Sequence, residues 1–143
     1  MDKVQGFKDL FAWQKAMRLV ESVYRLSACF PAKEQFGLTA QLRRAAVSIP
    51  SNVAEGHGRR ARADYIRFLD IARGSANEVE TQLLLAEQLG LIGKGAAGEC
   101  LSLCDEVQRI IKGLILSLER KRGSRPTPPQ ASGLRPQTSE AQP

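Results

Sequence analysis

An unbroken series of apolar residues between positions 65 and 86 constrains the fold more than any other feature of the sequence. The spacing alternates strictly between four and three residues, through Tyr65, Leu69, Ala72, Ala76, Val79, Leu83 and Ala86. An α-helix places residues at this spacing on one face, so the pattern predicts a long helix with a continuous apolar stripe. We expect Asp64 or a nearby residue to cap this helix and Gly90 to end it.

A second helical pattern, over residues 9–29, carries two adjacent apolar seams. One holds Trp13, Met17, Val20, Tyr24 and Ser27, and the other holds Ala16, Leu19, Val23, Leu26 and Phe30. Two seams exceed what one partner helix covers, which predicts either a wide face in a bundle core or a second contact with another subunit. We expect Asp9 to cap this helix and Phe30-Pro31 to end it.

Two further helical segments complete the pattern. The segment from about Phe36-Gly37 to Glu55 contains Pro50, which predicts a kink. Gly56-His57-Gly58 is expected to end this helix, with a glycine in the left-handed conformation. The last segment covers residues 96–122. Four long helices joined by short turns predict an all-α fold, an antiparallel up-down-up-down four-helix bundle.

The domain boundaries follow from composition. Residues 1–8 read as a lead-in, 9–122 as the four-helix bundle and 123–143 as a disordered tail that holds five of the seven prolines. The chain contains three cysteines, an odd number, and shows neither a signal peptide nor an apolar run long enough to span a membrane. We therefore expect a cytoplasmic protein that does not associate with membranes.

The sequence offers no positive support for catalysis. The single histidine, His57, is interpreted as a polar residue in a turn between helices rather than a general base. Cys100 and Cys104, one helical turn apart, could supply two thiolates to zinc, but both lie in an apolar stripe and are expected to pack in the core. We predict a protein that is not an enzyme and uses neither a cofactor nor a metal.

Positive charge is the main functional signal. The formal net charge is +6 and the sequence pI is near 9.6, which permits attraction to phosphate backbones. The candidate nucleic-acid-binding residues are Arg43, Arg44, Arg59, Arg60, Arg62 and Arg67. A second basic cluster, at residues 120–125, also complements the dipole of the last helix. In an up-down bundle this cluster and the turn after the second helix share one end of the molecule.

The arginines also have structural interpretations. Arg43 or Arg44 could pair with carboxylates such as Glu55 or Asp70. The sequence shows no aromatic stacking platform beside the arginines, which weakens the signal for nucleic-acid binding. Asn52 and the nearby serine hydroxyls are expected to satisfy backbone groups around the proline and so to determine the fold.

One stretch is more specific than these patterns. Residues 36–56, which read FGLTAQLRRAAVSIPSNVAEG, closely resemble the signature of the 23S ribosomal RNA intervening-sequence protein family. The similarity continues through Gly58-Arg59-Arg60 to the segment YIRFL at 65–69. It also includes FKDL at 7–10, Trp13, Lys15 and ETQL at 80–83, and so covers about residues 5–120.

This resemblance implies a four-helix bundle that assembles into a homopentamer. It also implies kinship with the accessory variability-determinant protein of diversity-generating retroelements, a basic pentamer that binds nucleic acid and a reverse transcriptase. Arginines of the family pattern are matched here at positions 43, 44, 59, 60 and 67.

The leading functional hypothesis is therefore an oligomeric accessory protein that binds nucleic acid, structured RNA or an RNA–protein complex. The alternative is an adaptor oligomer that grips a protein partner, such as a reverse transcriptase, without contacting nucleic acid. A metal-dependent or histidine-dependent nuclease is a distant third.

Overall fold

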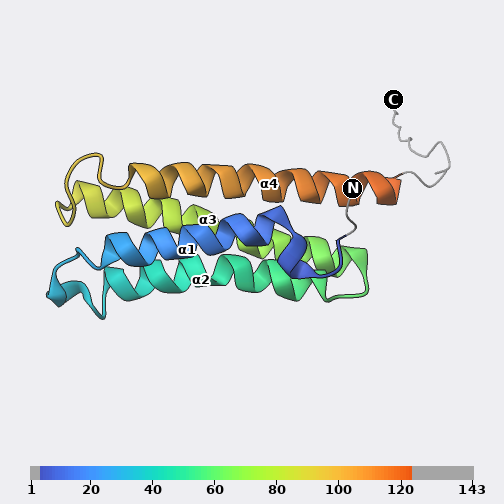
Figure 1. The fold of residues 1–143 in the computed structure, drawn as a ribbon, viewed down its shortest axis with the longest axis horizontal. Coiled ribbons are helices and arrows are strands. Elements are labelled where there is room, and N and C mark those ends of the chain that lie inside the picture. Colours follow the sequence, from blue (N-terminus) through green and yellow to red (C-terminus); the bar gives the residue numbers. More distant parts are fainter. Residues whose placement is uncertain (1–3, 124–143) are drawn as a thin grey trace, which may run out of the picture.

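Four α-helices, each antiparallel to the next along the chain, form the computed structural model, which describes residues 4–123 (Figure 1). Their bounds are α1 Phe11–Ser27, α2 Leu38–His57, α3 Arg62–Gln88 and α4 Gly98–Gly123, with short 3₁₀ helices at η1 Phe7–Asp9 and η2 Ala32–Glu34. Each helix packs against its neighbours in the chain, and α1 packs against α4 to close the ring. The predicted up-down-up-down bundle is confirmed.

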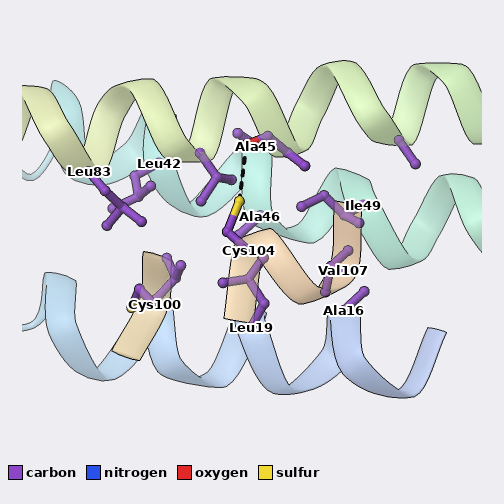
Figure 2. Packing of buried hydrophobic residues seen from close by; sticks show 14 of the residues in the cluster. Ala16, Leu19, Leu42, Ala45, Ala46, Ile49, Leu83, Cys100, Cys104 and Val107 are labelled. Carbon is purple, nitrogen blue, oxygen red and sulfur yellow. Dashed lines mark hydrogen bonds between the residues drawn. The ribbon is translucent and has the colours of Figure 1, made fainter. Parts of the chain in front are cut away.

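The core lies along the bundle axis and is built from the predicted stripes. Six of the seven residues of the α3 series are buried, and Tyr65 packs against them from a half-buried position. The other helices supply large side chains that are fully buried, among them Leu19, Leu42, Ile49 and Val107 (Figure 2). Burial of this apolar surface is the main favourable contribution to folding.

Both α4 cysteines lie in the core, as predicted. Cys104 Sγ donates a hydrogen bond to the Ala76 carbonyl at 3.3 Å (Figure 2), and Cys100 Sγ lies 3.0 Å from the Ser22 hydroxyl. Burial raises the pKa of Cys104 to about 12, and also raises the pKa of Cys100. Both thiols therefore stay protonated at neutral pH and act as small core residues.

The helix N-termini differ from the predictions. α1 begins at Phe11 after Leu10, so Asp9 is not its cap; the Asp9 carboxylate instead accepts a hydrogen bond from the Gln5 backbone N–H at 2.8 Å. α3 begins at Arg62, two residues before Asp64, which lies in the first turn. An acidic residue there still complements the helix dipole without serving as the cap.

α2 continues through Pro50 as one helix to His57. Asn52 Nδ2 donates a hydrogen bond to the Ser48 carbonyl at 2.8 Å, which confirms the expected role of Asn52 near the proline. The Ser48 hydroxyl instead accepts hydrogen bonds from side chains, including one from Asn52 Nδ2 at 2.9 Å. The expected left-handed glycine is wrong at Gly58, whose φ is −80°. Positive φ occurs instead at Gly90 and Gly95, between α3 and α4.

The predicted tail falls outside the described residues, except for Gly123, the last residue of α4. Within residues 4–123, no helix is both long and apolar enough to cross a membrane.

Candidate nucleic-acid interface

The α2–α3 turn presents arginines at one end of the bundle. Arg59 and Arg60 lie between the two helices, Arg62 is the first residue of α3, and all three are exposed. The turn is tight because Gly56 packs directly on α3. A Cβ atom at this glycine would lie 2.8 Å from the Phe68 Cβ and 3.1 Å from the Tyr65 carbonyl oxygen.

Phe68 brings one of these arginines, Arg59, together with Arg67 of α3. The guanidinium carbon of Arg59 lies 4.8 Å from the centroid of the Phe68 ring, and that of Arg67 lies 4.6 Å from it. Such stacking is a cation–π contact, and it holds both guanidinium groups on one aromatic side chain. Phe68 is thus an aromatic partner for the arginines that sequence reasoning missed. We call Arg59, Arg67 and Phe68 the arginine platform.

Carboxylates flank the platform on its own helices. Glu55 accepts a hydrogen bond from Arg59 at 2.8 Å, and Asp64 lies 3.8 Å from Arg67. All four side chains are substantially exposed, so each pair is weak and leaves the guanidinium groups accessible to a stronger anion. The prediction that Glu55 or Asp70 would pair with Arg43 or Arg44 is wrong, since Asp70 lies beside Arg73.

Arg43 has a different role from the turn arginines. Its Nε donates a 2.7 Å hydrogen bond to the Ser27 hydroxyl, a second nitrogen lies 3.4 Å from the Tyr24 carbonyl, and its guanidinium carbon lies 4.5 Å from the Tyr24 ring centroid. Arg43 therefore fastens α2 to the end of α1. Its neighbour Arg44 is exposed and lines a cleft between α2 and α3.

The end of α4 adds further positive charge. Arg120 and Lys121 are exposed, and the end of α4, the α2–α3 turn and the start of α1 lie at the same end of the bundle (Figure 1). The predicted sharing of one end by the two basic clusters is thus confirmed for their described members. Arg125 lies outside the described residues.

His57 packs in this region against Tyr65 of α3. Its ring meets Tyr65 edge to face, with the centroids 5.8 Å apart, and burial raises the pKa of Tyr65. Among residues 4–123, no group of three or more histidine, cysteine, aspartate and glutamate residues is placed to hold a metal ion.

A second surface feature runs along α1 and α2. An apolar groove of about 350 Å³ lies between them, lined by Trp13, Met17, Val20, Val47, Pro50, Ser51 and Ala54. It continues toward Tyr24 and Phe36, and the Phe36 side chain is 90% exposed. Trp13, Met17 and Val20 of the first α1 seam line this groove, whereas Ala16, Leu19 and Val23 of the second seam lie in the core.

These features define the class: an all-α four-helix bundle with an arginine-rich end and an apolar groove on α1 and α2. The sequence model of the 23S rRNA-intervening sequence proteins matches residues 8–113, and the chain belongs to that family. It is similar to a crystal structure from Bacteroides thetaiotaomicron, a protein of unknown function from the S23 ribosomal protein family. The identity is 25% and the TM-score 0.67, over 73% of this chain and 97% of the other. No curated protein matches the sequence.

Proposed function

We propose that this protein is a non-enzymatic, oligomeric accessory protein that binds nucleic acid, structured RNA or an RNA–protein complex, through its arginine-rich end. The observation that carries the proposal is the arginine platform, where two guanidinium groups share one aromatic ring beside the exposed Arg60 and Arg62. Guanidinium groups match phosphate oxygens with paired hydrogen bonds, and stacking limits the entropy lost when they bind.

The position of the charge supports the same function. The α2–α3 turn, which carries the exposed Arg59 and Arg60, and the end of α4, which carries the exposed Arg120 and Lys121, lie at one end of the bundle (Figure 1). The start of α3 also directs free backbone N–H groups toward this end, which favours anions. The bound phosphates would therefore contact one end of each subunit.

Neutralising the turn arginines tests the proposal. We expect a variant with Arg59→Gln, Arg60→Gln and Arg62→Gln to bind a labelled structured RNA more weakly. The slope of log affinity against log salt concentration, which is negative, should also become shallower by roughly 2 to 3, as expected for the loss of three phosphate contacts. Fluorescence anisotropy measures both quantities.

A charge-matched control separates this site from net charge. Arg18→Gln, Arg25→Gln and Arg109→Gln remove the same charge from exposed positions on α1 and α4. The control is expected to retain most of the affinity. A turn variant that binds RNA as well as the parent would refute the arginine-rich end as the binding surface.

The adaptor alternative draws on the apolar groove between α1 and α2. Its exposed Met17, Val47 and Phe36 form a surface that suits another protein, either a second copy of this chain or a partner such as a reverse transcriptase. Recovery of a protein partner in a complex that nuclease treatment leaves intact would favour this alternative.

A further inference from the structure

A polar cleft between α2 and α3 stands apart from the arginine platform. Its volume is about 400 Å³, and it is lined by Gln41, Arg44, Ala45, Ser48, Glu78 and Gln82. Five of these six side chains are polar, which is unusual along a helix–helix contact whose other positions form the core. Gln41, Arg44 and Glu78 lie at its exposed rim, and Ser48 and Gln82 lie deeper.

Two side chains that line the cleft, Gln82 and Glu78, carry acceptor oxygens with no donor among the described residues. The Gln82 Oε1 atom is buried and has no hydrogen-bond partner among the described residues. The Glu78 carboxylate is exposed, and no ion pair within residues 4–123 engages it. A buried acceptor without a donor is costly, so the pair favours a ligand that brings several N–H groups.

The cleft and the arginine platform lie on one helix–helix seam. Phe68, Ser75 and Gln82 recur every seven residues on α3, and Gln41, Ser48 and Glu55 do so on α2, so each set forms a stripe. The stripes meet at the middle, where the Ser75 hydroxyl donates a 2.8 Å hydrogen bond to the Ser48 hydroxyl.

The two sites also open on the same side of α3. Glu78 follows Arg67 by eleven residues, close to three full helical turns, which places both on one side of the helix at a separation of roughly 16 Å. One extended strand of nucleic acid can therefore contact both sites.

We infer that this cleft holds an unpaired guanine base of a strand whose phosphates lie on the arginine platform; the inference rests on the proposed function. The Watson–Crick edge of guanine presents N1–H and the exocyclic amino group, which suit the two acceptors. Arg44 is placed to donate to the O6 or N7 atoms or to stack on the ring. Adenine and cytosine each offer one amino group, and uracil offers a single N–H.

The base preference is measured with three single-stranded RNAs. Each is a short oligouridine with one central position occupied by guanosine, by inosine, which lacks the amino group, or by an abasic sugar. In anisotropy titrations the parent protein is expected to bind the guanosine RNA about tenfold more tightly than the abasic RNA. The inosine RNA should fall between them.

Variants of Glu78 and Gln82 test whether the cleft is the source of the preference for guanosine. Glu78→Gln and Gln82→Met should each reduce the guanosine preference while leaving affinity for the abasic RNA unchanged, because phosphate contacts dominate that affinity. Glu80→Gln is the control, since Glu80 is also exposed on α3 but lies outside the cleft lining. Glu78 is exposed, so its replacement does not endanger folding.

The outcomes separate the inference from the proposed function. Equal affinity of the parent for all three RNAs, with a steep salt dependence, would overturn the guanine site and leave phosphate binding intact. Binding of none of the RNAs at low salt would overturn both. Free GMP that binds as tightly as the guanosine RNA would overturn the assignment to a strand, because a mononucleotide would then suffice.

Discussion

Gly56 shows how a single residue controls the shape of the arginine-rich end. A methyl group there would press on Phe68 and Tyr65 at 2.8 to 3.1 Å. We expect Gly56→Ala to lower the free energy of unfolding by about 1–3 kcal/mol through overpacking, measured by urea denaturation.

Gly74→Ala provides the matched control for this substitution. Gly74 is exposed within α3, and no heavy atom lies within 4 Å of the position that an added methyl group would occupy. Alanine there should stabilise the protein by about 0.5–1 kcal/mol. Equal effects of the two substitutions would contradict the close approach of α2 to α3 at Gly56.

The pKa of Cys104 gives a prediction about alkaline pH. Burial raises this pKa to about 12 in the folded protein, whereas an unfolded thiol titrates near 8.5. Above that value the unfolded chain binds fewer protons than the folded one, so stability falls as pH rises, by up to about 1.4 kcal/mol per pH unit.

Replacing Cys104 should remove the part of the fall in stability with rising pH that its thiol causes. Under reducing conditions, urea unfolding between pH 8 and roughly pH 10.5 is expected to show a shallower decline for Cys104→Ala than for the parent. Cys100 remains in both proteins, so the difference reports Cys104 alone. Parallel declines would show that the Cys104 thiol is accessible to solvent in the folded state.

Individual residues were harder to predict than the pattern they belong to. A sequence does not distinguish an arginine that is available to a ligand from one that is held by other parts of the protein. Only the structure shows that Arg43 donates a hydrogen bond to Ser27 while Arg44 lines a cleft. The Phe68 contact with Arg59 spans the turn between two helices, so no local spacing reveals it. An aromatic residue one position after Arg67 was the available signal.

At the scale of the helices, periodicity carried most of the information. The α3 stripe was predictable because burial of one face enforces the spacing. The starts of α1 and α3 were not, because neither helix has a side-chain cap and each begins after an extended residue, Leu10 or Ala61. A search for capping side chains therefore selected Asp9 and Asp64 wrongly as helix ends.

The junction between α1 and α2 depends on Arg43. We expect Arg43→Ala to lower the free energy of unfolding by about 1–3 kcal/mol, because it removes hydrogen bonds to Ser27 and Tyr24 and a cation–π contact. Arg44→Ala, at an exposed neighbouring position, should change stability by less than about 0.5 kcal/mol. Urea denaturation measures the free energy of unfolding of both variants. Equal losses of stability would contradict the structural role of Arg43.

For the whole molecule, the apolar groove predicts self-association. If copies of the chain meet through α1 and α2, Val47→Glu should dissociate the oligomer without unfolding the bundle, because Val47 is 41% exposed and lines the groove. Light scattering after size exclusion measures the mass, and circular dichroism the helix content.

Leu84→Glu is the control for that experiment. Leu84 is 47% exposed on α3, away from the groove. It should leave the mass unchanged. A Val47→Glu protein with the mass of the parent would place any subunit contact elsewhere and leave the groove free for another protein.

Binding of RNA by the parent protein tests the central claim most directly. Fluorescence anisotropy with a labelled structured RNA, at low and at moderate salt, should show tight binding that weakens steeply as salt rises, since phosphate contacts release counterions. Absence of binding even at low salt would contradict the account and leave a helical scaffold whose partner is a protein.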